Sequence, residues 1–133
     1  MLYGIGCDLC QVERMARRLS GPHGAHFAQR VFGAAEQAAL GLAEAAQGPL
    51  PAHKAESAAA DFAAKEAFLK AAGKGLGDFA LADIQALRRE SGAPYYQLSG
   101  PAADWLAEKG LTARLSLSHE GGLALAFCVL EQA

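Results

Sequence analysis

The sequence of 133 residues has few cysteines, no excess of charge of one sign and no long apolar run. Its three cysteines are an odd number, which argues against a disulfide framework and favours free thiols. Twelve basic residues stand against fourteen acidic ones, a net charge of -2, so nucleic acid is not an expected partner. No segment approaches the roughly 18 apolar residues that a membrane-spanning helix requires.

The N-terminus has no basic segment and reaches Asp8 early, so no secretory signal is expected. Apolar residues make up 52% of the chain and charged residues 20%, a composition that excludes disorder as the main state. The length suits one hydrophobic core. We therefore expect a soluble, cytoplasmic protein with a single domain over residues 1–133 and no membrane partner.

Apolar periodicity predicts an α+β fold, a single domain with a mostly antiparallel sheet and packed helices. A buried strand over residues 2–7 is expected to place Asp8 at its C-terminal end. Helices are expected over residues 11–19, 34–46, 55–72 and 101–109, a short turn or helical piece over 27–32, and strands over 84–89, 95–98, 113–118 and 123–130. The last strand is apolar on both faces and should lie in the middle of the sheet. Gly73 should end the longest helix.

Two glycine motifs begin like nucleotide-binding signatures but do not complete them. Gly4-Ile5-Gly6 lacks the third glycine of a dinucleotide fingerprint, because Leu9 stands in its place. Gly73-Lys74 resembles the end of a Walker loop, but Gly75 replaces the required serine or threonine. The loop around Lys74 either presents backbone N–H groups to an anion or simply connects a helix to a strand.

Cysteine and histidine chemistry finds little support. Cys7 and Cys10 have C-x-x-C spacing, but a zinc site needs two more ligands and Cys128 is alone on an apolar strand. Ser118 shares one face of a predicted strand with Ser116, and His119 follows at its end. A single histidine near a turn is more often structural, and no G-x-S-x-G motif indicates a Ser-His-acid triad.

The helix over residues 61–70 carries the most informative pattern. Phe62, Glu66 and Lys70 follow one another at four-residue spacing, so they share one helix face. Glu66 and Lys70 could form a plain surface ion pair. They could also serve a metal–phosphate site, where a carboxylate binds Mg²⁺ and lysine offsets phosphate charge.

Six segments, in order, resemble the holo-acyl-carrier-protein synthases, the small bacterial type of 4′-phosphopantetheinyl transferase. They span the chain from residue 2 to about 131, apart from a gap over about 43–57. The segments are Gly4-Ile5-Gly6-Cys7-Asp8-Leu9 with Val12-Glu13-Arg14-Met15; Phe27, Arg30-Val31-Phe32 and Glu36; Phe62-Ala63-Ala64-Lys65-Glu66-Ala67 with Lys70 and Gly73-Lys74-Gly75; Asp83-Ile84; Gly92-Ala93-Pro94; and Leu117-Ser118-His119.

The resemblance implies transfer of phosphopantetheine from coenzyme A to a serine of an apo acyl carrier protein, with release of adenosine 3′,5′-bisphosphate. In the family pattern Asp8 and Glu66 bind Mg²⁺, and Lys70 offsets charge on the transferred phosphate. Glu66 or a water on the metal would accept the serine proton. The implied coenzyme A cleft contains Lys70, Gly73, Lys74, Gly75, Pro94, Ser118 and His119.

Charge in the first quarter of the chain agrees with an acidic protein partner. Residues 1–33 contain four arginines against Asp8 and Glu13, a local net of +2. The resemblance assigns Arg14 and Met15 to carrier-protein docking, and Arg18 lies on the same basic helix, whose charges could also be merely solvated. The family is typically a homotrimer with sites between subunits, so the resemblance implies a trimer.

Departures from the family pattern are expected to alter details of the site. Asp61 stands where the family usually has a basic residue, so a phosphate contact there is lost or replaced, and Lys74 could restore that charge. Residues 49–53 resemble a mobile insertion.

The alternative function is a non-catalytic module of the same fold that binds coenzyme A or a nucleotide. The sequence leaves open whether the carrier protein serves fatty acid or polyketide synthesis.

Overall fold

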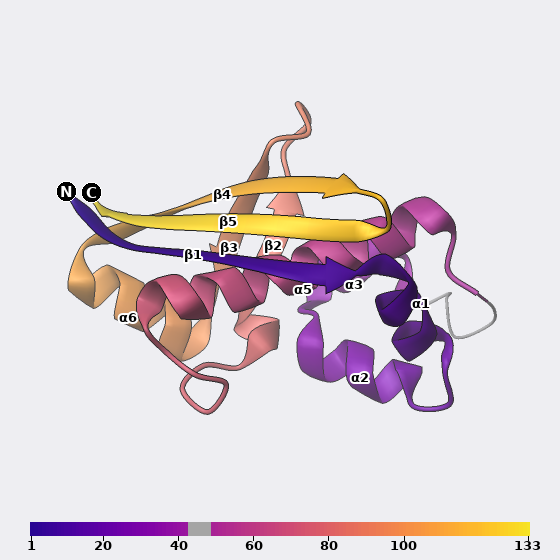
Figure 1. Ribbon diagram of the computed structural model, residues 1–133. Coiled ribbons are helices and arrows are strands. Elements are labelled where there is room, and N and C mark those ends of the chain that lie inside the picture. Colours follow the sequence, from indigo (N-terminus) through magenta and orange to yellow (C-terminus); the bar gives the residue numbers. More distant parts are fainter. Residues whose placement is uncertain (43–48) are drawn as a thin grey trace.

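The computed structural model describes residues 1–42 and 49–133. Helix α5 packs across one face of a three-stranded antiparallel sheet of order β1-β5-β4, and β2 and β3 form a separate antiparallel hairpin (Figure 1). The elements in order are β1 (Leu2–Gln11), α1 (Val12–Ser20), α2 (Gly24–Val31), α3 (Ala34–Leu40), α5 (Ala52–Ala72), η1 (Leu81–Asp83), β2 (Ile84–Arg88), β3 (Pro94–Leu98), α6 (Gly100–Lys109), β4 (Leu111–Glu120) and β5 (Leu123–Gln132). The predicted α+β class with antiparallel pairing is confirmed, although the strands form two sheets.

Helix ends follow the predicted glycines in most places. Gly73 ends α5 in the left-handed conformation with φ of 70°. The helix expected over residues 34–46 is shorter, because Gly41 adopts φ of 67° and ends α3 at Leu40; residues 43–48 lie outside the described part of the chain. The longest helix begins at Ala52, three residues before its predicted start at Ala55, and the insertion over residues 49–53 stays a prediction.

Strand β1 differs from its prediction in length and in burial. It continues past Asp8 to Gln11, so Asp8 is not at its end. Asp8 pairs with Ala126 of the neighbouring strand β5. Only alternate residues of β1 face α5, because side chains of a strand alternate between its two faces. Ile5 and Leu9, on the other face, are 56% and 60% exposed, so the strand is half-exposed.

Strand β5 lies in the middle of the sheet, as predicted. Ala124, Ala126, Cys128 and Leu130 are fully buried on the face toward α5. Leu123, Leu125 and Phe127 on the opposite face are about 40% exposed. We call this opposite side the outer face of the sheet; its exposed apolar residues are Ile5, Leu9, Leu123, Leu125 and Phe127.

Two glycines allow β1 to lie directly on α5. A Cβ atom at Gly4 would collide with the carbonyl oxygen of Ala71, and one at Gly6 would collide with that of Ala67. The Gly4-Ile5-Gly6 motif, which resembled a nucleotide signature, therefore serves close strand–helix packing. The residue two positions further on the same face of β1 is Asp8, so this packing brings its carboxylate against α5.

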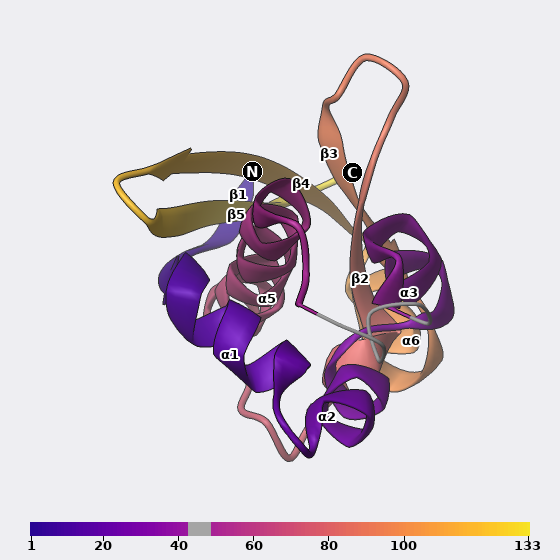
Figure 2. The same cartoon turned by 90° about the vertical axis from the view of Figure 1, so that its right-hand side faces the viewer.

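The two ends of the chain meet at one edge of the molecule (Figure 1). The backbone N–H of Gln132 donates to the carbonyl of Met1 at 2.9 Å, and Leu2 pairs with Glu131. The β2–β3 hairpin projects from the body of the molecule, beyond α5 and the sheet (Figure 2). None of the helices in the part of the chain that the structure describes has the length and apolarity needed to cross a bilayer.

Candidate functional site

The side chains of Asp8 and Lys70 meet where β1 crosses α5. The ammonium of Lys70 lies 3.1 Å from a carboxylate oxygen of Asp8 and donates to the carbonyl of Cys7 at 3.0 Å. The hydrogen bond to Asp8 is the main reason that the pKa of Lys70 is raised. Within the described residues, Lys70 thus pairs with Asp8 of β1 and not with Glu66 of its own helix.

Glu66 completes this group of charges from one helical turn before Lys70. Burial raises the pKa of Glu66, and the nearby carboxylate of Asp8 raises it further, while Lys70 lowers it. Two neighbouring carboxylates are the donor set that a hard divalent cation favours, because the cation offsets the repulsion between them. The structure therefore brings together Asp8, Glu66 and Lys70, which are distant in sequence, and the residues present fit a Mg²⁺ site beside an anion.

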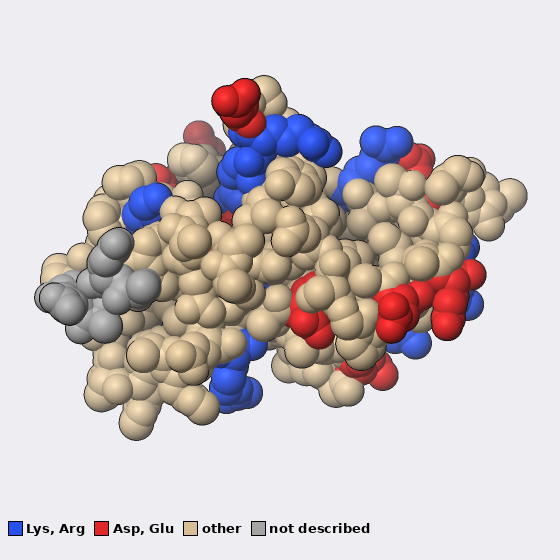
Figure 3. Space-filling view, turned by 180° about the vertical axis from the view of Figure 1, so that it is seen from behind, with Lys and Arg blue, Asp and Glu red and all other residues tan. Residues whose placement is uncertain are grey.

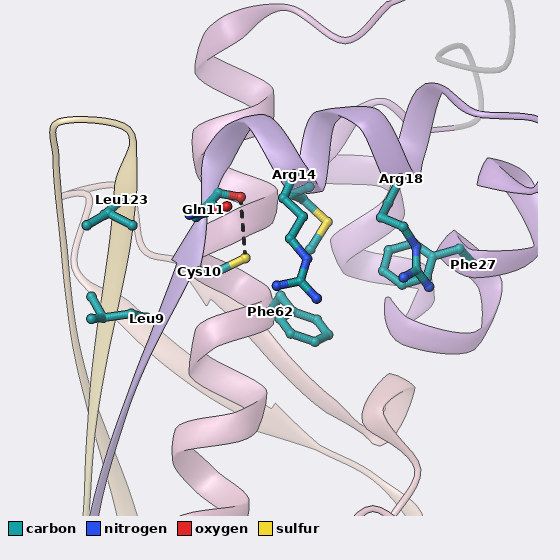
Figure 4. A pocket seen from close by; sticks show the side chains of 9 residues that line it. Leu9, Cys10, Gln11, Arg14, Arg18, Phe27, Phe62 and Leu123 are labelled. Carbon is teal, nitrogen blue, oxygen red and sulfur yellow. Dashed lines mark hydrogen bonds between the residues drawn. The ribbon is translucent and has the colours of Figure 1, made fainter.

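A cavity of about 420 Å³ lies between the end of β1, helix α1 and Phe62 of α5 (Figure 4). Phe62 lies one turn before Glu66 on α5, and Cys10 lies two residues after Asp8 on the same face of β1, so the cavity and the carboxylates are neighbours. The cavity is lined by Leu9, Cys10, Gln11, Arg14, Met15, Arg18, Phe27, Phe62 and Leu123. It is an apolar hollow with two guanidinium groups, suited to an apolar side chain that has acidic neighbours.

The three residues predicted to dock a partner lie at this cavity but differ in exposure. Met15 is only 4% exposed and packs in the core, so it contributes to the wall of the hollow and little to the surface. The guanidinium of Arg18 lies 4.3 Å from the centre of the Phe27 ring, an arrangement that holds the side chain in place. Arg18 and Phe27 also line a second, basic cavity of about 300 Å³ with Arg17, Arg30, His23 and His26.

The loop after α5 has its amides engaged within the chain. The N–H of Lys74 donates to the carbonyl of Leu69 at 2.9 Å, and the N–H of Gly75 donates to the Asp78 carboxylate at 2.8 Å. The N–H of Gly73 donates to the carbonyl of Lys70 at 3.2 Å. The ammonium of Lys74 lies 5.9 Å from the centre of the Trp105 ring. This loop therefore offers an anion the side chain of Lys74 more readily than a nest of free amides.

Three further predicted positions lie apart from Asp8 within one chain. Ser118 pairs with Leu125 on the outer face, whereas Asp8 faces α5. His119 faces α5, and its Nδ1 lies 3.1 Å from the carboxylate of Glu56, ten residues or about 15 Å along the helix from Glu66. Pro94 begins β3 in the projecting hairpin. Strand alternation and the separate hairpin account for this distribution.

Asp61, the main departure from the family pattern, points toward the hairpin. It is 3% exposed, and the guanidinium of Arg88 lies 2.8 Å from its carboxylate. Burial raises the pKa of Asp61 to about 7 despite the nearby Arg88. Seen from behind, basic side chains lie along the projecting hairpin below an acidic tip, while other acidic side chains gather toward the end of the molecule that carries α6 (Figure 3).

Sequence reasoning missed several contributions to the site region. Phe27 and Phe62 were matched to the family without a role, yet both line the first cavity. The four-residue spacing of Phe62 and Glu66 was the available signal. Cys7 and Cys10, three positions apart on one strand, face opposite sides of the sheet, so their thiols do not converge. Within residues 1–42 and 49–133, no three His, Cys, Asp or Glu side chains gather into a metal-binding group.

Comparison with known proteins gives concordant matches. Residues 4–128 match the model of the 4′-phosphopantetheinyl transferase superfamily. A curated holo-[acyl-carrier-protein] synthase of Myxococcus xanthus is 40% identical over 128 residues, covering 96% of this chain and 94% of the relative. One of Burkholderia multivorans is 40% identical over 131 residues, covering 98% of this chain and 87% of the relative.

Solved structures agree with these relatives. A holo-[acyl-carrier-protein] synthase of Neisseria meningitidis has a TM-score of 0.81 at 34% identity, covering 99% of this chain and 100% of that one. An enzyme of the same name from Bacillus anthracis, solved in complex with coenzyme A (3′,5′-ADP), has a TM-score of 0.76 at 28% identity. That match covers 100% of this chain and 99% of the relative.

Proposed function

Because the chain belongs to the 4′-phosphopantetheinyl transferase superfamily, as an enzyme of its holo-acyl-carrier-protein synthase group, we propose that it loads an apo acyl carrier protein. The reaction transfers 4′-phosphopantetheine from coenzyme A to a serine of the carrier and releases adenosine 3′,5′-bisphosphate. The observation that carries this proposal is the meeting of Asp8, Glu66 and Lys70 beside a basic, apolar hollow. The coenzyme A complex of the Bacillus anthracis relative supports the choice of donor.

The carboxylates of Asp8 and Glu66 would hold Mg²⁺, which when bound offsets negative charge on the pyrophosphate of coenzyme A. Glu66, which lies beside Lys70 and Asp8, accepts the proton of the carrier serine. The serine oxygen then forms a bond to the phosphorus that bears pantetheine. The bond between that phosphorus and the bridging oxygen breaks, and adenosine 3′,5′-bisphosphate leaves with its electron pair.

Lys70 supports this transfer electrostatically. Its ammonium, held at 3.1 Å from Asp8, offsets the charge that builds on the transferred phosphate. Gly73, Lys74 and Gly75 begin three residues after Lys70, at the end of α5, so they extend the same wall toward the rest of coenzyme A. In this loop we assign the contact with the anionic part of coenzyme A to the ammonium of Lys74, because the backbone amides of the loop already donate to groups of the same chain.

The cavity beside Phe62 serves as the docking site of the carrier protein in this proposal. An apolar carrier side chain enters the hollow, while acidic carrier groups pair with Arg14 and Arg18 at its edge. Met15 shapes the wall from the core. Since Phe62 and Glu66 are four residues apart, about 6 Å along the helix, a carrier docked here presents its serine to the carboxylates.

We further propose a homotrimer that assembles through the outer face. Ile5, Leu9 and Phe127 all expose apolar side chains there, and a group of exposed apolar side chains on one face is typical of an interaction surface. Ser118 lies on this face, and Pro94 lies on the projecting hairpin, so both are placed to reach a neighbouring subunit. In such an assembly His119, Ser118 and Pro94 complete coenzyme A clefts between subunits. The cytoplasmic location stays a prediction.

The test is the intact mass of apo acyl carrier proteins of fatty acid and polyketide type after incubation with the protein, coenzyme A and Mg²⁺. A gain of one phosphopantetheine that EDTA abolishes is expected. No gain with any carrier, from a folded sample that still binds coenzyme A, would instead support the non-catalytic binding module. Light scattering of the same sample measures the trimer, and a monomeric mass would contradict it.

A further inference from the structure

Lys65 precedes Glu66 on α5 but points away from the carboxylates into the interior. Its side chain is fully buried, and its ammonium pairs with the carboxylate of Glu36 on α3. The same ammonium donates to the carbonyls of Leu81 at 3.1 Å and Ile84 at 2.7 Å, in η1 and β2. These three acceptors use all three N–H groups of the lysine.

Glu36, the partner of Lys65, forms further hydrogen bonds to the neighbouring elements. Its carboxylate accepts the backbone N–H of Gly33 at 3.0 Å and that of Ala86 at 2.9 Å. Its own backbone N–H donates to the side-chain oxygen of Gln85 at 3.0 Å. The Glu36–Lys65 pair therefore joins α3, α5, η1 and the first strand of the projecting hairpin.

The pair is costly to bury, which argues that its geometry matters more than its net stabilisation. Burial raises the pKa of Glu36 and lowers the pKa of Lys65, so desolvation opposes the charged form of both groups. Fully buried ion pairs often contribute no more stability than apolar side chains of the same volume. An apolar pair would not fix the orientation of α5 in this way. Only the charged groups form hydrogen bonds to defined atoms, and these bonds connect α5 with α3, η1 and β2.

The direction of Lys65 fixes the direction of Glu66. Successive residues project from an α-helix about 100° apart, so anchoring one side chain sets the rotation of the helix and the aim of the next. On the opposite side, Gly6 lets β1 rest on Ala67. A rotation of α5 by about 10° would move a side-chain tip about 6 Å from the axis by about 1 Å.

We propose that Lys65, held by Glu36, is a positioning residue for the transfer reaction: it fixes the rotation of α5 and so holds Glu66 beside Asp8. This inference rests on the proposed function, in which Glu66 takes the serine proton. A displacement of about 1 Å at such a group commonly slows an enzyme about 100-fold.

The experiment compares Glu36→Gln and Lys65→Met with Leu130→Ala as a matched control. Leu130 is fully buried on β5, four residues or about 13 Å along the strand from Ala126, the partner of Asp8. With rates expressed per folded molecule, Lys65→Met is expected to lower kcat about 100-fold and Glu36→Gln about 10-fold. KM for carrier and coenzyme A should stay within about twofold, and Leu130→Ala should keep the wild-type kcat.

Crystal structures give a readout that does not depend on turnover. The separation of the Asp8 and Glu66 carboxylates should differ from wild type by more than about 0.5 Å in Glu36→Gln, which keeps the volume of the side chain and removes one acceptor. A folded Glu36→Gln protein with wild-type kcat and unchanged separation would overturn the inference, even if Lys65→Met does not fold. If the wild type itself transfers nothing, the proposed function fails, and the separation alone then decides whether Lys65 positions Glu66.

Discussion

Replacing Gly6 with alanine tests whether the close packing of β1 on α5 is what assembles the site. The added Cβ would lie 2.7 Å from the backbone nitrogen of Ala71 and 2.9 Å from the Cβ of Lys70. Ordinary contacts begin near 3.4 Å, so strand and helix must separate by about 0.7 Å there. The carbonyl oxygen of Ala67 lies closer still, so the total displacement is about 1 Å.

This displacement acts on chemistry because Asp8 moves with the strand. Its carboxylate would leave the hydrogen bond that Lys70 now donates at 3.1 Å. We expect kcat of Gly6→Ala to fall about 100-fold, as for a misplacement of about 1 Å. Overpacking of the interior should also lower the free energy of unfolding by about 1–3 kcal/mol.

The assay is carrier-protein mass against time, with thermal unfolding recorded on the same samples. Gly77→Ala is the matched control, since a Cβ at Gly77 meets no heavy atom within 4 Å and its φ is not positive. That control should keep wild-type activity and melting temperature. A Gly6→Ala protein that matched Gly77→Ala in both measurements would refute the reasoning, because the strand would then have tolerated the collision without moving Asp8.

Four other predictions address single groups. Glu66→Gln should abolish transfer while leaving the fold intact, and a folded variant with wild-type turnover would refute its role as metal ligand and base. Lys70→Ala should lower kcat more than it weakens coenzyme A binding measured by calorimetry; an unchanged rate would leave it only the ion pair with Asp8. Arg14→Glu should raise KM for the carrier protein and not for coenzyme A, and equal increases would contradict docking at the cavity. Asp61 has a pKa raised from 3.8 to about 7, so the folded state binds its proton more tightly than the unfolded state does. The contribution of Asp61 to the free energy of unfolding should therefore fall by roughly 4 kcal/mol as pH rises from about 4 to about 7, and the difference between urea titrations of the wild type and Asp61→Asn should show this loss.

The order of the elements could be predicted from periodicity, but their exposure could not. The apolar residues on both faces of residues 123–130 predicted that β5 is a central strand, and Gly73 predicted the end of α5. What remained hidden was that Ile5 and Phe127 would face outward, because apolar residues on both faces of a strand do not say what covers each face. A strand that meets another subunit has the same sequence pattern as one in a core.

The site was predictable only in part. Glu66 and Lys70 share a helix face, which their four-residue spacing indicates directly. That Asp8 joins them required the resemblance, because no local pattern links a strand residue to a helix near the middle of the chain. The pairing of Glu36 with Lys65 left no signal, since a lysine in a helix is usually exposed and only the packing of three elements encloses this one.

The meeting of the two chain ends has a consequence for the kinetics of folding. Asp8 reaches its place only when β1 pairs with β5, which closes a loop between residues 8 and 126. Closing a loop of that length costs about 4 kcal/mol of chain entropy beyond a constant term, and contacts so distant in sequence slow folding. The helices and the β2–β3 hairpin need only local contacts and can form earlier. During refolding, transfer activity should therefore return with the slowest phase, after helical signals have recovered, because the carboxylate at Asp8 is delivered by the last strand pairing.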